Sequence, residues 1–482
     1  MKQIAEYITL LTLLLTAGNA YAQGDTLARY IGIAASNNPL LKSEFTIYRA
    51  SLQKIPQAGA YPDPQLEIGF FIKPMEIIDG KQIADFKLMQ MFPWFGTKKA
   101  AGNEAAQMAR MAYEKFRDTK DKLILDVKTT WYQLGNLQQR LITIRENKAL
   151  LTVLKDLATS RFSAPGSQGA VQQATSAATP PPAAGAQTAS GGMAGMGSMG
   201  AQPGQAAPPQ SSGMGQMGGG SSMGGSPGGM SDVLRVQLEL NELEDEEQAA
   251  ISEITSAVAK FNTLLNRDPR TPVDIPQTVS RQEFILDDNT VMELIKQQNP
   301  MLRMAAAEAD AYAAKLKMDK KMSLPMLGIG LQYSLIGKRM DMGIPVTDMN
   351  GMDMLMPMVT ISIPIYRNKY KAQQKESKLM KQAAEEKYRG TLNTLTSGYI
   401  SVKQQLDDAG RKVSLYERQA GLARMTYQLA VKEFAAGKAG MASVLDVQRQ
   451  LLDYKFKRSE SIAAYNTIVA AIENLMSVSQ DD

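Results

Sequence analysis

The sequence predicts a mainly α-helical chain that contributes a few strands to a membrane β-barrel. Three observations predict this class: a tandem internal repeat, a Pro-free helical stretch of roughly 65 residues in each copy, and paired strands whose apolar and polar residues alternate. Only 6% of the residues are aromatic, while Ala, Gln, Lys, Glu and Leu are abundant. This composition is typical of long helices that pack as coiled coils.

The residues that are missing exclude several function classes. The chain has no Cys and no His, so it lacks a catalytic thiol, a thiolate metal site, the commonest general base and the commonest metal ligand. We therefore expect no enzyme and no cofactor. The net charge of +5 is dispersed without a Lys/Arg block, which argues against a nucleic acid partner.

The N-terminus has the pattern of a signal peptide over residues 1–22. Lys2 gives a charged start, Ile8 begins an apolar stretch, and Ala20-Tyr21-Ala22 forms a cleavage signal. A buried helix is the alternative, but the Ala-x-Ala end favours export. No later segment approaches the roughly 20 apolar residues of a spanning helix, so we expect strands to make any membrane crossing.

The chain is a tandem duplication. The Asn-Pro pair at 38–39 recurs at 299–300, and the segment at 230–240 recurs at 441–451. The offset between copies is 261 residues at the Asn-Pro pair, 272 residues at Phe162 and 211 residues after the insert, so 272 − 211 = 61 residues are inserted in the first copy. The insert, 167–229, is rich in Gly, Pro, Ser and Met, and we expect it to be disordered.

Each copy is expected to contain one very long helix. The first repeat covers 23–166 and continues after the insert as a return helix over 230–272, and the second repeat covers 273–482. The Pro-free stretches are Gly96–Arg161 and Asn368–Ala436. Each would span roughly 100 Å at 1.5 Å per residue, which suits coiled-coil packing better than a globular core.

Two strand pairs are expected, at about 64–92 and about 324–364. A soluble sheet would also alternate, but two repeat-related pairs on an exported chain favour a barrel with its apolar face outward. Four strands cannot close a barrel and an open edge is untenable in lipid, so several copies must complete it. The alternation predicts lumen-facing methionines on the polar side: Met89, Met91, Met326, Met356 and Met358.

The order of these features resembles the TolC-like outer-membrane efflux channels. The resemblance rests on the Asn-Pro at each repeat start, the Pro-led strands, "MQMFPWFG" (89–96) before a long helix and "EFAAGKAGMASVLDVQRQLL" (433–452). It implies a homotrimer in the outer membrane, with four strands per chain in a twelve-stranded barrel, in contact with outer-membrane lipid. It also implies a long α-helical coiled-coil tunnel in the periplasm, a periplasmic adaptor (membrane fusion) protein and an inner-membrane efflux pump.

The resemblance further implies a gate at the periplasmic tip, near residues 437–441. Asp446 from three copies would form an acidic ring; alternatively, it pairs with a neighbouring Lys or Arg on a solvated helix. Ser443 stands where the family's best-known members carry a second acid, and Ala439 where a basic residue is expected. The predicted gate residues are Phe434, Gly437, Lys438, Ser443 and Asp446, with Phe162, Asp232 and Arg235 in the first repeat.

Methionine is abundant, at 30 residues, and is concentrated in the insert and in the second strand connection. Thioether sulfur is a soft, uncharged ligand that selects Cu(I) or Ag(I). The methionines predicted to contact such ions are Met193, Met196, Met199, Met214, Met217, Met223 and Met230. Low-complexity drift in the insert and gap filling by Met in the loop are the alternatives.

The function predicted from the sequence is a passive export channel of the copper or silver branch of this family. Drugs, amphiphiles or secreted proteins are alternative cargoes for the same architecture. A periplasmic coiled-coil scaffold or adaptor without a pore is the alternative of another class, and the alternating strands argue against it.

Overall fold

The computed structural model describes residues 22–77, 79–163, 230–339 and 348–478. The predicted insert, and the predicted signal peptide up to residue 21, lie outside these ranges. The chain divides into two compact units. The larger unit comprises Met1–Thr143, Glu247–Ala420 and Tyr454–Asp482, and the smaller unit comprises Ile144–Glu246 and Gly421–Asp453.

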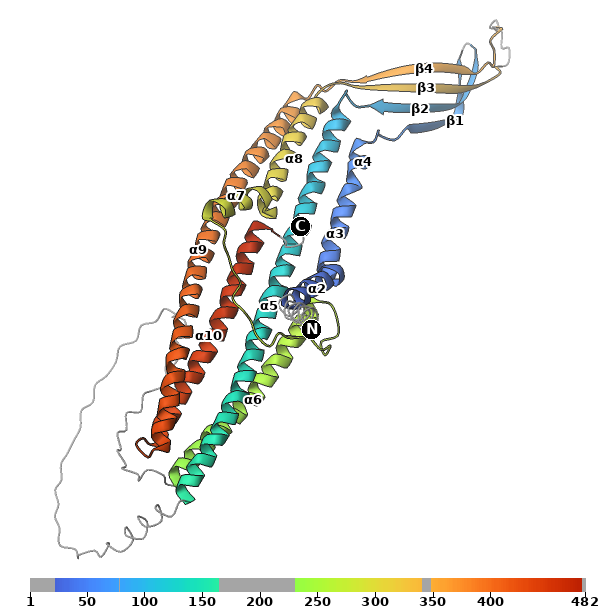
Figure 1. Cartoon of the computed structure of the whole chain (residues 1–482). Helices are drawn as coiled ribbons and strands as arrows, with labels where there is room; N and C mark the ends of the chain where they lie inside the picture. The colour runs from blue at the N-terminus through green and yellow to red at the C-terminus, as the bar shows by residue number, and fades with distance from the viewer. Residues whose placement is uncertain (1–21, 78, 164–229, 340–347, 479–482) are drawn as a thin grey trace, which may run out of the picture. The chain divides into compact units, whose positions relative to one another are not determined.

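The two repeats contain equivalent elements in the same order (Figure 1). The first repeat contains α2 (Ala22–Asn37), α3 (Pro39–Leu52), α4 (Lys54–Gly59), β1 (Gln65–Ile77), β2 (Gly80–Phe92), α5 (Thr97–Ser163) and α6 (Met230–Leu264). The second contains α7 (Asp288–Gln298), α8 (Pro300–Met322), β3 (Met326–Gly337), β4 (Met354–Ser362), α9 (Arg367–Ala435) and α10 (Met441–Met476). The return helix α6 ends before the predicted residue 272, because Asn266 adopts a left-handed conformation, with φ of 52°.

The four strands form one antiparallel sheet in the order β1-β2-β3-β4. The sequence pattern suggests that the last strand starts at Met358, but β4 begins at Met354 and includes Pro357. Proline is tolerated there because β4 is an edge strand, where one row of backbone groups needs no partner within the sheet. Among the described residues, β1 and β4 each pair on one side only.

The Asn-Pro pairs start α3 and α8 in the same way. The Asn38 side chain accepts hydrogen bonds from Leu40 N and Leu41 N, at 3.0 and 3.2 Å, and its Nδ2 donates to Leu264 O. The Asn299 side chain likewise caps α8 and donates to the carbonyl of Leu475, at 2.9 Å. Proline follows each cap because the first helical position needs no N–H. Each Asn therefore ties the start of one helix to the end of its return helix.

The larger unit has one apolar core centred on each repeat, and the first core also includes Ala463 and Ala470 of α10. In the first, Tyr30, Trp131 and Phe261 pack together with ring centroids 5.2–5.8 Å apart. In the second, Val291 and Ile472 occupy the positions equivalent to Tyr30 and Phe261, and both are fully buried. The duplicated sequence thus keeps the same positions buried while the residues that fill them change.

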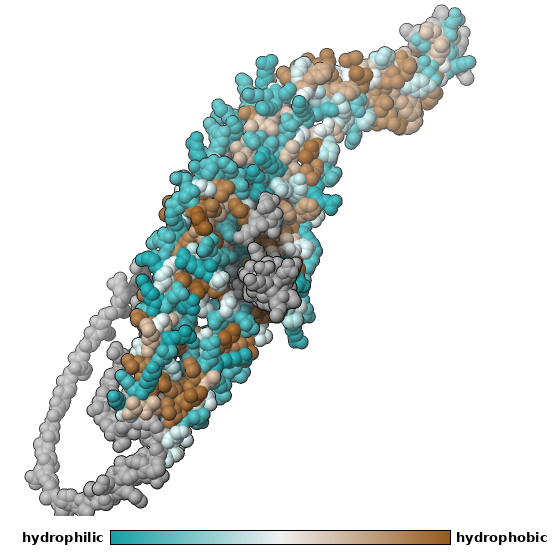
Figure 2. Space-filling model, viewed as in Figure 1, coloured by the Kyte–Doolittle hydropathy of each residue, from teal (hydrophilic) through white to brown (hydrophobic). Residues whose placement is uncertain are grey.

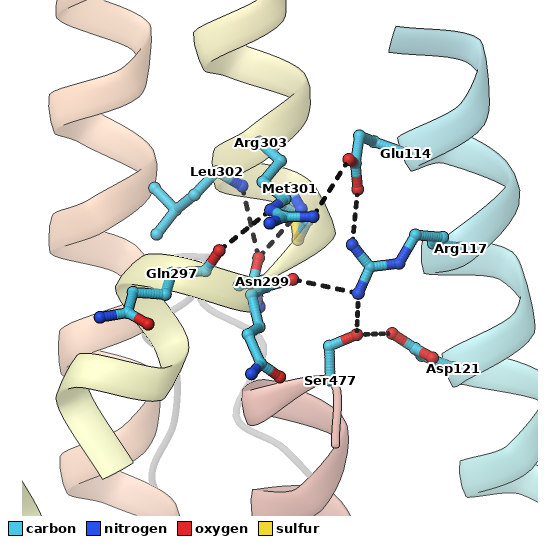
Figure 3. A network of polar contacts seen from close by, with 10 residues as sticks. Glu114, Arg117, Asp121, Gln297, Asn299, Met301, Leu302, Arg303 and Ser477 are labelled. Carbon is cyan, nitrogen blue, oxygen red and sulfur yellow. Dashed lines mark hydrogen bonds and ion pairs between the residues drawn. The ribbon is translucent and has the colours of Figure 1, made fainter. Parts of the chain in front are cut away.

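A polar network joins α5 to the α7–α8 junction and to the end of α10 (Figure 3). Arg117 contacts Glu114 at 3.0 Å and donates to the Ser477 hydroxyl at 3.1 Å. Ser477 in turn donates to Asp121, whose carboxyl pKa is raised by burial, although this hydrogen bond opposes the shift. Arg303 on α8 also reaches Glu114, at 3.7 Å. The network fixes the three segments with charge-assisted contacts.

The two functions of Asn299 can be separated by substitution. Asn299→Ala removes both the cap and the bond to Leu475, and should lower the free energy of unfolding by about 2 kcal/mol. Asn299→Ser keeps a capping oxygen and should lose about 1 kcal/mol. Thermal unfolding of the purified protein provides the measurement, with the exposed Asn393→Ala on α9 as a control expected to stay within about 0.5 kcal/mol. Equal losses for Ala and Ser would contradict the cap.

Candidate functional site

One face of the sheet is polar. The register places Glu67, Lys87, Gln332 and Met356 in one row across the four strands. Side chains that are directly opposite in antiparallel strands point to the same face. Lys87 Nζ lies 3.6 Å from Glu67 Oε2, so the charges in this row are paired.

The next polar row is centred on Asp85. Its carboxylate accepts hydrogen bonds from Gln82 Nε2 at 2.9 Å and from the Ser334 hydroxyl across the β2–β3 pair. Gly69 and Met354 complete the row on β1 and β4. The polar groups of this face therefore satisfy one another, and the face remains hydrophilic.

The opposite face is apolar, and the described part of the chain leaves it exposed. Figure 2 shows hydrophobic residues gathered over the strands. Val359 on β4 is 75% exposed and Phe70 on β1 is 73% exposed. The register places the members of this face in common rows, which include Leu66, Leu88, Leu331 and Pro357, and Ile68, Phe86, Tyr333 and Leu355.

Gln90 is the polar exception on the apolar face. It pairs with Ile329, which pairs with Val359. Its Nε2 donates to the carbonyls of Pro62, at 2.7 Å, and Met91, at 3.0 Å. Backbone acceptors at the end of the sheet thus satisfy the amide, which allows a polar residue to interrupt the apolar alternation of β2.

The five methionines predicted on the polar side share the polar face. Met89 and Met358 flank Gly330, and Met91 lies beside Gly328. A Cβ on Gly328 would meet the Met91 sulfur at 2.6 Å, so glycine makes room for the thioether. Met326 and Met356 complete the predicted set. That this face lines a lumen stays a prediction.

Met354 also belongs to the polar face, opposite Ser334, and the sequence analysis missed it. The period-two spacing of Met354, Met356 and Met358 would have revealed it had the strand been started before Pro357. Among the described residues, no three acidic side chains cluster in a way that could hold a metal ion. In the described part of the chain, the methionines of this face are therefore the soft-ligand candidates.

In the smaller unit, the turn after α9 contains the first predicted gate residues. Phe434 is fully buried, while Gly437 has a φ of +75°. Gly437 N donates to Phe434 O at 3.0 Å and Lys438 N donates to Glu433 O at 2.9 Å. These two bonds form the Schellman motif, which requires a left-handed residue and explains the glycine. Phe434 anchors the turn, and Lys438 is exposed.

On α10, Ser443 and Asp446 are exposed. The Ser443 hydroxyl donates to Gly440 O, and Asp446 lies one turn before Arg449. Arg449 forms a bidentate ion pair with the buried carboxylate of Glu239 on α6. The hydrogen bonds that Arg449 donates to Glu239 raise the Arg449 pKa, and the charge of Asp446 adds to the shift. Arg449 forms its ion pairs with Glu239 and Glu242, and the role of Asp446 stays a prediction.

The remaining predicted site residues lie on α5 and α6 or outside the described residues. Asp232 is half-buried and Arg235 is exposed on α6, while Phe162 lies in the last turn of α5. Met230 is the first residue of α6 and is 53% exposed. The insert methionines, Met193, Met196, Met199, Met214, Met217 and Met223, lie outside the described residues. The gate and metal roles of all these residues stay predictions.

Comparisons with known proteins identify the fold. The structure matches VceC from Vibrio cholerae with a TM-score of 0.65 at 13% identity, over 94% of this chain and 96% of that chain. It matches CusC with a TM-score of 0.66 at 12% identity, over 94% and 92% of the two chains. It also matches the outer-membrane channel OprN with a TM-score of 0.64 at 14% identity, over 94% and 90%. No curated protein sequence matches the chain.

Part of the sequence also matches the model of a known protein family. Residues 291–478 match the outer membrane efflux protein family. None of the described helices is long and apolar enough to cross a membrane. The mainly helical fold with four strands per chain, predicted from the sequence, is confirmed, and the family comprises outer-membrane channels rather than enzymes. Residues 291–478 are therefore similar to the outer membrane efflux proteins, and the described chain has the fold of the channels named above.

Proposed function

We propose that the chain forms, as a homotrimer, the outer-membrane conduit of a tripartite efflux system. The observation that carries this proposal is the two-faced, four-stranded sheet with unpaired edges. Three copies would pair the β4 edge of one chain with the β1 edge of the next, which removes every open edge from the lipid. A periplasmic adaptor and an inner-membrane pump would supply the drive.

Exposed apolar stripes in the smaller unit support association between copies. On α9, Leu422, Met425 and Leu429 are 62%, 61% and 57% exposed, and their spacing of three and four residues puts them on one helix face. On α6, Leu234 and Leu238 are 55% and 64% exposed. Apolar stripes of this kind pack against a facing helix in coiled coils. We infer that the α9 stripe of one copy contacts the α6 stripe of the next.

Cross-linking tests the trimer, because the natural chain has no Cys. In a Leu234→Cys, Met425→Cys double variant, a short bis-maleimide should link neighbouring copies and give covalent trimers on a denaturing gel. Neither single variant should give trimers. A Leu234→Cys, Ser443→Cys pair, which uses the polar face of α10, serves as the control. Monomers alone from the first pair, in protein extracted from outer membranes, would contradict the arrangement.

We further propose that the transported solute is a soft monovalent metal ion, Cu(I) or Ag(I). Six thioethers of each chain share the polar face: Met89, Met91, Met326, Met354, Met356 and Met358. Uncharged sulfur ligands bind such ions without a deep electrostatic well. Weak sites in series allow an ion to enter and to leave, as conduction requires.

Metal tolerance of a deletion strain tests the substrate. Met89, Met91, Met356 and Met358 would be changed together to Leu, which preserves volume and removes the sulfur. We expect silver and copper tolerance to fall severalfold relative to complementation with the natural chain. The control changes three exposed helical methionines, Met108, Met322 and Met380, to Leu and should complement fully.

Two further results would decide between substrates. Full metal tolerance with the four-fold Leu variant would contradict metal contact on this face. Loss of tolerance to drugs or amphiphiles, with metal tolerance unchanged, would favour the alternative cargo. A version lacking 167–229 belongs in the same experiment: unaltered metal efflux would remove the insert from the metal path and leave the channel proposal intact.

A further inference from the structure

A cavity of about 440 Å³ lies where β2 leads into α5, beside β3 and β4. It is lined by aromatic rings from before β1 (Tyr61), from the end of β2 (Phe92) and from the link to α5 (Trp94 and Phe95), and by Ile329 and Val359. Its volume falls in the roughly 300–1,000 Å³ range of small-ligand sites. All of these residues belong to the larger unit.

The cavity opens on the apolar face of the sheet. Ile329 and Val359 share one row of that face and are 62% and 75% exposed. Tyr61 and Phe92 meet edge to face with centroids 5.5 Å apart, and Phe95 is 79% exposed. The rings form walls that the chain itself leaves uncovered. Such walls suit a flexible apolar ligand that slides between them.

One ammonium group lines this cavity, and a second contacts two of the lining residues, Phe95 and Gly96. Lys98 Nζ is 2.8 Å from the centroid of the Tyr61 ring, and Lys321 Nζ donates to Phe95 O at 3.0 Å. Gly96, with φ of +79°, brings Lys321 close, since a Cβ at this position would lie 2.5 Å from Nζ. Among the described residues, neither ammonium has a carboxylate within ion-pair distance. The positive charge beside the apolar cavity is therefore unbalanced within the described part of the chain.

We propose that this cavity binds a phospholipid, with an acyl chain between the aromatic rings and the phosphate against Lys98 and Lys321. This proposal rests on the proposed function in one respect, the apolar face lying against lipid. A phosphate supplies the anion that both ammonium groups lack. Lysine at a membrane interface keeps its stem on apolar surface and its charge at the headgroups. A neighbouring copy would pair at the β1 and β4 edges, whereas this cavity opens on the face.

The test is native mass spectrometry of the purified full-length protein with added phosphatidylglycerol. The Lys98→Gln, Lys321→Gln double variant should bind the lipid about tenfold more weakly than the natural chain. The control is Lys99→Gln, Lys320→Gln, which removes the same charge from the adjacent exposed positions and should bind normally. A Lys98→Arg, Lys321→Arg variant should retain binding. Diacylglycerol, which has the acyl chains without the phosphate, should not be retained.

Three results would overturn the proposal. In the first, the Lys98→Gln, Lys321→Gln variant binds phosphatidylglycerol as tightly as the natural chain does. In the second, the Lys99→Gln, Lys320→Gln control weakens phosphatidylglycerol binding as much as the Lys98, Lys321 variant does. In the third, the natural chain retains diacylglycerol as well as phosphatidylglycerol. Channel conductance of the same preparations separates this failure from failure of the proposed function. Conducting channels that retain no phospholipid overturn the lipid site alone, and protein that forms no channel at all contradicts the conduit.

Discussion

The unpaired backbone groups at the two edges of the sheet are the constraint on which the rest of the structure depends. Each free N–H and C=O would cost several kcal/mol in hydrocarbon, so β1 and β4 cannot both remain edges in a membrane. The chain cannot close the sheet on itself, because four strands are too few. The proposed head-to-tail pairing between identical chains would satisfy both edges with one contact.

The internal duplication provides the two hairpins of the sheet from two equivalent repeats. Each repeat supplies one hairpin and one pair of long helices, and each repeat fixes them with an Asn-Pro cap tied to the end of a return helix. The return helices also end alike, since Asn266 and Ser477 both adopt left-handed conformations, with φ of 52° and 53°. Equivalent anchors in both repeats give two hairpins that can lie side by side in one sheet.

Much of this architecture could be predicted from the sequence, because it rests on local periodicity. Period-two alternation located the strands and assigned five methionines to one face, and the absence of proline located α5 and α9. Gly437 was also predictable, since a left-handed position at a helix end favours glycine.

The features that escaped prediction depend on position in the sheet or on distant partners. Because of Pro357, the predicted last strand begins too late. Whether a strand lies at an edge and tolerates proline is decided by pairing, which a linear pattern does not contain. The side chain of Lys321 reaches Phe95 across 226 positions of sequence. Ser477 joins Arg117 and Asp121 only because α10 ends beside α5. Sequence periodicity carries no information on contacts between residues that lie far apart in the sequence.

The central claim is that the polar face of the sheet lines a conducting pore. Gln332 and Leu331 are adjacent on β3 and point to opposite faces, and the natural chain has no Cys. Single-channel recording in planar bilayers with a cationic thiol reagent therefore tests the claim directly. The reagent should lower the conductance of Gln332→Cys and leave Leu331→Cys unchanged. A block of Leu331→Cys with no effect on Gln332→Cys, or no conductance from intact trimers, would contradict it.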